Sequence, residues 1–361
     1  MVQFLFLTLS AWGGELTVDM LDVGQGDAIL IRVDGHAALI DAGPRDADTV
    51  AQIRALGVES LDFVVATHPH ADHIGLMAEV ITSFDVDVYI DNGMTHTTKN
   101  YERVMAAVTA TEVGYQQAKT GMAFELGDEA TFTVLFPGDT LLSGTRSDLN
   151  SNSVVLRLDH GQISFLFTGD SEGATEGALL GADIKSVDVL KVAHHGSGHS
   201  SSGAFLAKLK PEAALISVGA DNRYHHPYDE ALDRLRTVGA LVYRTDLSGN
   251  IRAVSDGNGV EILEGSLPEL DLVKIVPWPD HPAVVDAEPE PQPTSEPKPA
   301  PSDVRGVRLK RRVFLDRLAR ERPNADRSLL IREWRAYKKA WRLATRLERK
   351  AHKQADIEPE V

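Results

Sequence analysis

The densest group of potential metal ligands in the chain is the heptapeptide THPHADH, residues 67–73, which follows the apolar stretch LDFVVA. Its three imidazoles and one carboxylate suit zinc, manganese or iron. His68 and His70 lie two residues apart and can share one ion, whereas Asp72 and His73 can turn toward a second. The alternative is a histidine-rich surface turn, but the motifs after two later apolar stretches favour the metal site.

Two further motifs place ligand-type side chains at the ends of apolar stretches. FLFTGD ends at Asp170, whose carboxylate can bridge two cations, although a Gly-Asp pair after a strand is often only a turn. LKVAHHGS carries His194 and His195, and one imidazole can bind a metal while the other hydrogen-bonds a substrate oxygen.

Two weaker groups complete the candidates. The segment DNRYHHP, residues 221–227, combines donors, a cation and imidazoles, which can hold an anionic substrate. A loop that leads into a helix near Pro227 explains the same residues equally well. Asp41 ends an early strand, where it can orient a metal-binding histidine from behind or serve only as a turn carboxylate.

Strands that end at these motifs must position them. Strands are expected over residues 16–23, 28–33, 37–41, 61–66, 87–90, 130–136, 153–158, 163–168, 187–192 and 213–217, and helices over 49–56, 101–110, 201–209 and 229–238. Strands with interspersed helices predict a layered domain of the α/β or α+β class.

Composition and charge divide the chain. It has 361 residues, of which 43% are hydrophobic and 25% charged, so a packed core is expected. It contains no cysteine, which excludes disulfides and thiolate ligands. The formal net charge is −16, yet Val304–Lys353 carries 18 Lys and Arg against 5 Asp and Glu. An acidic body therefore precedes a basic tail.

We predict four parts in the chain. They are residues 1–14, a possible signal or first strand; 15–268, the catalytic domain; 269–303, a Pro/Glu-rich linker; and 304–361, a basic helical tail. The apolar run Val2–Trp12 is too short to span a bilayer, and no other segment is expected to cross one. An exported, periplasmic location is favoured, with a cytoplasmic one as the alternative.

The basic tail has an apolar stripe at helical spacing that includes Leu330, Trp334 and Tyr337. Three partners fit this pattern: nucleic acid, the acidic body or a partner protein, and an anionic membrane surface. The acidic body should repel a polyanion at long range, and a tail that binds DNA would offset this repulsion.

The combination of THPHADH, FTGD and AHHGS resembles the metallo-β-lactamase superfamily of binuclear metal hydrolases. The motifs DVGQGD, IDAG, SNSVVL, LKVAHHGS, NRYHHP and RTD are similar to the hydrolase domain at the C-terminus of ComEC-type DNA-uptake channels. The resemblance covers about Leu16–Val260 and lacks the channel's membrane part, so we expect a free-standing relative. It implies an αββα sandwich with the metals at one edge.

The resemblance implies two divalent ions, zinc or manganese, held by His68, His70, Asp72, His73, Asp170 and His195. His68 and His70 would hold the first ion and Asp72 and His73 the second, with Asp170 bridging and His195 completing the second site. It further implies catalytic roles for Asp72, His194 and His226, substrate contacts from Asn152, Ser197, Asn222 and Tyr224, and an orienting role for Asp41.

One feature departs from the superfamily pattern. Most members have another histidine about eighteen residues before the bridging carboxylate, but here residues 148–153 read DLNSNS. Asn150, Asn152 or water is expected to replace that ligand. A site richer in oxygen shifts metal preference toward manganese.

The expected reaction is phosphodiester hydrolysis, with DNA as the leading substrate, which makes the protein a nuclease. Two divalent ions activate water near neutral pH, Asp72 orients it, and His194 or His226 stabilises or protonates the leaving oxygen. The alternative enzyme is a small-molecule (phospho)ester hydrolase of the cell envelope. The alternative from another class is a non-catalytic binding module on the same fold.

Overall fold

The computed structural model of the chain describes residues 14–111 and 113–267. The predictions for the apolar stretch Val2–Trp12, the linker 269–303 and the basic tail 304–361 lie outside the described residues. Among the helices in the described ranges, none has the length and apolarity needed to cross a membrane.

One half of the fold is an eight-stranded sheet in the order β15-β14-β1-β2-β3-β4-β5-β6. Its strands are β1 (Leu16–Met20), β2 (Ile29–Val33), β3 (His36–Ile40), β4 (Ser60–Val65), β5 (Asp85–Asp91), β6 (Gly114–Gln117), β14 (Asn250–Ser255) and β15 (Val260–Gly265). β3 to β6 run parallel, whereas β1, β2 and β3 pair antiparallel. The parallel strands β3 and β4 are buried on both faces, which explains their nearly continuous apolar sequence.

The other half is a seven-stranded sheet in the order β13-β12-β11-β10-β9-β8-β7. Its strands are β7 (Ala123–Leu126), β8 (Ala130–Phe136), β9 (Val155–His160), β10 (Ile163–Phe167), β11 (Val189–Lys191), β12 (Ala213–Ile216) and β13 (Leu241–Arg244). β10 to β13 are parallel, and β7 to β10 are antiparallel. Each sheet therefore has four neighbouring parallel strands at one of its sides, β3 to β6 in the first sheet and β10 to β13 in the second.

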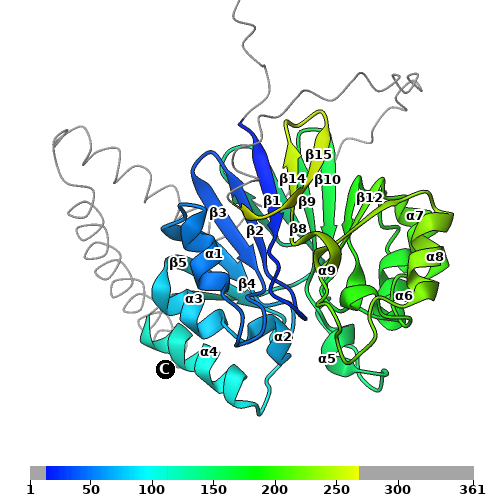
Figure 1. Ribbon diagram of the computed structural model, residues 1–361. Helices are drawn as coiled ribbons and strands as arrows, with labels where there is room; N and C mark the ends of the chain where they lie inside the picture. The colour runs from blue at the N-terminus through cyan, green and yellow to red at the C-terminus, as the bar shows by residue number, and fades with distance from the viewer. Residues whose placement is uncertain (1–13, 112, 268–361) are drawn as a thin grey trace, which may run out of the picture. The chain divides into compact units, whose positions relative to one another are not determined.

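Helices cover the outer face of each sheet, as Figure 1 shows. Against the first sheet pack α1 (Thr49–Ala55), α3 (Met77–Ser83) and α4 (Lys99–Ala110), and against the second pack α6 (Gly173–Gly181), α7 (Gly203–Leu209) and α8 (Asp229–Thr237). Between the sheets, Phe63 of β4 meets Phe124 and Phe132 of the second sheet at ring-centroid distances of 5.7 and 5.3 Å. These four layers confirm the predicted αββα sandwich of the α/β class.

The ligand-type residues lie on short segments that follow the parallel strands. These segments include α2 (Ala71–Ile74) and the 3₁₀ turn η1 (Ala193–Gly196), and nearby are α5 (Asp148–Ser151) and α9 (Thr245–Ser248). The backbone N–H of Val154 donates to the carbonyl of Thr67 at 2.9 Å and joins the segment after β4 to the segment before β9. Because the carboxyl ends of parallel strands share one edge, side chains from both sheets meet there.

Candidate metal centre

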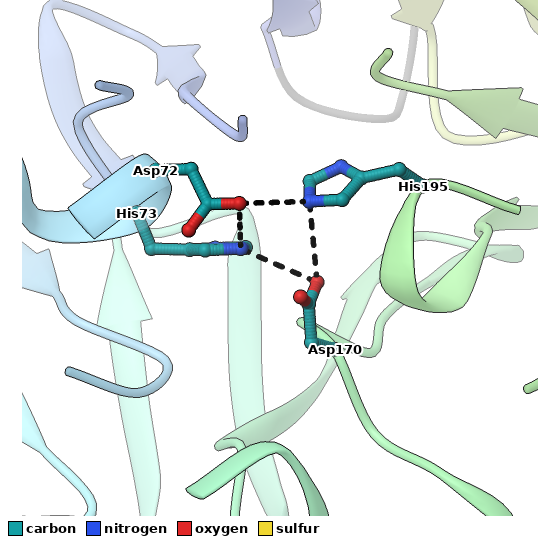
Figure 2. A group of neighbouring side chains, drawn as sticks. All are labelled: Asp72, His73, Asp170 and His195. Atoms are coloured by element: carbon teal, nitrogen blue, oxygen red, sulfur yellow. Dashed lines mark ion pairs between the residues drawn. The ribbon is translucent and has the colours of Figure 1, made fainter. Parts of the chain in front are cut away.

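Four side chains from both halves of the fold converge in one buried group, shown in Figure 2. The Nε2 atoms of His73 and His195 lie 3.3 and 3.6 Å from Oδ1 of Asp170. The Oδ2 atom of Asp72 lies 3.6 Å from Nε2 of His195 and 4.0 Å from Nε2 of His73. α2 supplies Asp72 and His73, the end of β10 supplies Asp170, and the turn after β11 supplies His195.

The donor atoms of this group fit a divalent cation. Nε2 of His73, Nε2 of His195 and Oδ1 of Asp170 are all buried, and no hydrogen bond satisfies them. Buried polar atoms without partners are costly, and a cation at their centre would satisfy all three. Two imidazole nitrogens and two carboxylates are also donors that zinc and manganese accept.

A second histidine group faces the other oxygen of Asp170. Nε2 of His68 lies 2.9 Å from Nδ1 of His70 and 3.8 Å from Oδ2 of Asp170. Nε2 of His194 lies 3.6 Å from the same Oδ2 atom. The two oxygens of Asp170 thus point to two different sets of imidazoles, as a bridging carboxylate requires.

Asp41 lies directly behind the group, at the end of β3. Its Oδ2 atom is 2.7 Å from Nδ1 of His73, and its two oxygens also accept hydrogen bonds from the backbone N–H and hydroxyl of Thr67. A carboxylate on the outer nitrogen of a histidine fixes the ring so that its other nitrogen faces the metal. The structure brings Asp41 to the position that the orienting role requires.

A buried ion pair between Asp27 and Lys191 also lies behind the centre. Asp27 precedes β2, and its carboxylate oxygens lie 3.4 Å from Nδ1 of His195 and 3.7 Å from Nδ1 of His73. Lys191 belongs to β11, and its ammonium donates to the carbonyl of Gly169 at 2.9 Å. One ion pair therefore contacts segments that carry ligands in both halves of the fold.

The electrostatics of the centre favour positive charge. Burial alone opposes the charged form of His73, yet Asp170 and Asp41 raise its pKa well above the ordinary value. Burial likewise disfavours charge on His195, but Asp170 and Asp27 raise its pKa to about 10. The carboxylates that stabilise these protons would equally stabilise a bound cation, so metal and protons compete for the same nitrogens.

The backbone around the centre adopts uncommon conformations. His194 and His195 both have positive φ, 52° and 53°. Gly169 has φ +51°, and a Cβ there would lie 2.9 Å from the Cβ atoms of Ser153 and Thr67. Glycine at this position allows the close approach of the segments that carry Asp170 and the THPHADH motif.

The structure shows which contacts the side chain of Asn152 makes. This side chain is fully buried, and its amide exchanges hydrogen bonds with the backbone of Leu142 at 2.8 Å and donates to the carbonyl of Asp148 at 2.7 Å. The polar atoms of Asn152 therefore fix the loop that contains Leu142 and Asp148, which precedes β9. Substrate contact and replacement of the missing histidine, the two predictions for Asn152, would each require these bonds to break.

Two other predicted substrate contacts also shape local turns. The amide of Asn222 bonds to backbone atoms of Gly219, Tyr224 and His226, so it closes its own loop. Ser197 is buried, and its hydroxyl accepts from the backbone N–H of His199 at 3.3 Å. Both side chains thus have internal partners, and substrate contact by either one stays a prediction.

Tyr224 and His226 lie beside the centre. The ring of His226 meets the ring of His194 at 5.4 Å and that of Tyr224 at 5.8 Å. Tyr224 is 43% exposed and therefore accessible. Burial, with the neighbouring His194 and His195, lowers the pKa of His226 to about 4.

Sequence reasoning missed four residues near the centre: Asp27, Lys191, Glu172 and Arg146. Arg146 makes a two-pronged ion pair with Glu172 at 3.0 and 3.2 Å, and Glu172 lies 3.5 Å from Nδ1 of His194. The one usable signal was Lys191, which interrupts the apolar stretch VDVLKVA. A lysine that is buried in a strand requires a carboxylate partner.

The Asp27–Lys191 pair yields a prediction about metal affinity. Either Asp27→Asn or Lys191→Met leaves a buried charge unpaired and should lower the unfolding free energy by about 3–5 kcal/mol. The double variant removes both charges and should regain stability, because net charge is unchanged and no unpaired ion remains. We still expect about 10-fold weaker metal binding, since a carboxylate charge near the outer nitrogens of His73 and His195 is lost, while Asp41 and the carbonyl of Ser217 still bond them.

Thermal melting and titration of the metal-free protein with Mn²⁺ check this prediction. The matched control is another buried pair, Asp19 with Arg252, which joins β1 to β14; Asp19 also pairs with Arg32 of β2, so this control is expected to lose some stability. The Asp19→Asn/Arg252→Met variant should bind metal normally. Normal metal affinity in the Asp27→Asn/Lys191→Met variant would show that its pair serves stability alone.

The sequence profile described as Metallo-beta-lactamase superfamily matches residues 21–220. This match covers more than half of the chain, and the sandwich fold and His/Asp centre agree with it. The chain belongs to the metallo-β-lactamase superfamily and is a metal-dependent hydrolase of that class, as its motifs predict.

Two bacterial proteins are similar to this chain over about two thirds of its length. ComE operon protein 3 of Bacillus subtilis is 31% identical over 274 residues, covering 70% of this chain and 34% of that protein. Competence protein ComA of Neisseria gonorrhoeae is 32% identical over 253 residues, covering 68% of this chain and 33% of that protein. The chain thus spans about a third of the length of these relatives.

One solved structure with similarity to this chain is YhfI from Bacillus subtilis, described as a metallo-beta-lactamase fold protein. It shares 14% sequence identity with this chain, with a TM-score of 0.47. The comparison covers 67% of this chain and 100% of that one.

Proposed function

We propose that the protein hydrolyses phosphodiester bonds of DNA. The observation that carries the proposal is the position of Asp170 between two sets of imidazoles, which fits two divalent ions at one carboxylate. Two ions a few ångströms apart suit in-line displacement at phosphorus, because they lower the pKa of a bound water and neutralise phosphoryl charge. The competence-protein relatives support DNA as the substrate.

The protein's own side chains would hold the ions and orient the reactants. His68, His70 and Asp170 would hold one ion, and Asp72, His73 and His195 with Asp170 the other. Asp72 is partly exposed, so one of its oxygens can accept a hydrogen bond from the attacking water. We assign His226, beside the centre, a hydrogen bond to a phosphoryl or leaving oxygen.

An exposed aromatic group beside the centre supports a nucleotide substrate. Tyr224 and Tyr228 are 43% and 42% exposed, and their rings lie 5.8 and 5.5 Å from that of His226. The guanidinium of Arg223 lies 4.8 Å from the centroid of Tyr224. Stacking rings next to a cation are the features with which proteins bind bases and phosphates of single strands.

The basic tail would supply the charge that the acidic body lacks. Val304–Lys353 carries 18 Lys and Arg in a chain whose net charge is −16. Phosphate contacts from such a segment would raise affinity for any DNA sequence and would weaken with salt. Binding to the acidic body or to a partner protein remains the alternative use of this segment.

Hydrolysis assays on metal-free protein supplied with Mn²⁺ or Zn²⁺ test the proposal. We expect cleavage of DNA, single- or double-stranded, and of bis-p-nitrophenyl phosphate, and both activities should fall at least about 10³-fold in His68→Ala, as loss of one ion removes several kcal/mol. A chain that ends before Pro277 should keep activity on the small diester and bind DNA more weakly.

Two outcomes would redirect the proposal. Cleavage of the small diester without cleavage of any DNA would favour a small-molecule phosphodiesterase. Bound metal without turnover of either substrate would favour a binding module.

A further inference from the structure

We infer that His194 is a ligand of the first metal ion and replaces the histidine that the sequence lacks before Asp170. His68, His70 and one oxygen of Asp170 give that ion three protein donors, one fewer than a closed tetrahedral site has. Asn152 is bonded to the backbone of its own loop, and the amide of Asn150 lies against the outer nitrogen of His194, so we look to His194 for the fourth donor.

The two oxygens of Asp170 separate the surrounding histidines into two sets. Oδ1 faces Nε2 of His73 at 3.3 Å and Nε2 of His195 at 3.6 Å. Oδ2 faces Nε2 of His68 at 3.8 Å and Nε2 of His194 at 3.6 Å. His194 therefore lies on the side of the first ion, although it is adjacent in sequence to a residue of the second site.

The outer nitrogen of His194 already faces the carboxylate partner that a metal ligand needs. Its Nδ1 atom lies 3.5 Å from Oε1 of Glu172 and 3.5 Å from Nδ2 of Asn150. Arg146 holds Glu172 in place through two hydrogen bonds. A carboxylate on one ring nitrogen orients the other toward the metal, so Nε2 is the atom free to coordinate.

The same contacts give Asn150 a different role from the predicted one. Its amide lies against Nδ1 of His194, and its Nδ2 atom also lies 3.5 Å from Oε1 of Glu172. Asn150 is thus behind His194 as seen from Asp170. We assign it a supporting role for His194 rather than a place among the ligands.

Backbone conformation explains how neighbouring residues can serve different ions. His194 and His195 both have φ in the left-handed region, and their rings are tilted by 71° with centroids 6.1 Å apart. The two side chains therefore diverge around Asp170. A coordinated Nε2 has no proton to give, so this assignment replaces the prediction that His194 is a proton donor.

Counting bound metal tests the inference without any substrate. Metal-free protein is titrated with Mn²⁺ at equilibrium, and electron paramagnetic resonance separates a coupled pair of ions from an isolated ion. We expect the unaltered protein to bind two ions. His194→Ala should keep one ion at normal affinity and bind the other at least about tenfold more weakly.

Double variants identify which ion His194 holds. The His68→Ala/His194→Ala variant should still bind one ion normally, because both changes affect the same site. The His194→Ala/His195→Ala variant should lose tight binding of both. His226→Ala is the matched control, since its ring contacts that of His194, and it should bind two ions.

Three results would overturn the inference. They are unchanged affinity for two ions in His194→Ala, loss of both ions in His68→Ala/His194→Ala, and a single ion in the unaltered protein. Melting curves confirm that each variant is folded. If His194→Ala does not fold, Glu172→Gln provides the same test, because it should weaken only the first ion, and normal binding of both would then refute the assignment.

Discussion

An Asp170→Asn variant is expected to hydrolyse phosphodiesters at least about 10³-fold more slowly than the unaltered protein, with weakened binding of both ions. The substitution keeps the size of the side chain but removes the charge that faces both sets of imidazoles. A pair of metal ions stabilises the transition state of hydrolysis by several kcal/mol. A loss of 4 kcal/mol corresponds to a rate about 10³-fold lower. Steady-state assays with bis-p-nitrophenyl phosphate, together with Mn²⁺ titration, measure both effects.

Asp91→Asn is the matched control for Asp170→Asn. Asp91 is also a buried carboxylate at the carboxyl end of a strand, but it accepts hydrogen bonds from Tyr115 and the backbone N–H of Gly93. Its variant should retain activity within about twofold, since the substitution leaves metal-activated hydroxide chemistry untouched. Equal losses in the two variants would attribute the effect to general disruption of the strand ends.

A Gly26→Ala variant is expected to lose about 4 kcal/mol of unfolding free energy and most of its affinity for the second ion. Gly26 has φ +151°, and a Cβ there would lie 2.2 Å from the carbonyl oxygen of Asp72. About 2 kcal/mol comes from backbone strain and about 2 from overpacking. The clash would also displace α2, which carries Asp72 and His73. Denaturant unfolding and Mn²⁺ titration measure the two losses.

Gly24→Ala separates these causes, because Gly24 also has positive φ, +70°, but a Cβ there meets nothing within 4 Å. It should lose only about 1–2 kcal/mol, the cost of the left-handed conformation, and bind metal normally. If Gly24→Ala and Gly26→Ala destabilise equally and neither affects metal, the close approach to α2 has no role in the centre.

The parts of the fold that the sequence predicted are those with strong local patterns. β8 runs over Ala130–Phe136, as its alternating apolar sequence predicts, and α4 begins within two residues of its predicted start. α6 was not predicted, because GATEGALLG is rich in glycine and its helical state depends on packing against β8 and α5. Strands β13 and β15 were likewise missed, since their residues are mostly half-buried and lack a clear apolar face. β14 was also missed, because its buried residues include Arg252 and Ser255, which interrupt the apolar pattern.

In the candidate centre, too, residues within one sequence motif could be predicted, whereas contacts between distant segments could not. The ligands in THPHADH could be predicted, because they lie close together in the sequence and follow a recognisable strand. The pairing of Asp27 with Lys191 joins two different sheets, and no local pattern encodes it. The contacts of Asn152 could not be predicted for the same reason, because its amide is bonded to Leu142, ten positions away on an irregular loop.

The distribution of ligands along the chain sets the order in which the centre can assemble. His68 and His70 come from one short segment of the N-terminal half, so they can capture an ion as soon as that segment is formed. Asp170 and His195 follow strands of the second sheet and meet Asp72 and His73 only where the two sheets pack together. Closing so long a loop is slow compared with local folding. We therefore expect the centre to be completed only after the two sheets have docked, so that binding of both ions would report that both halves are folded.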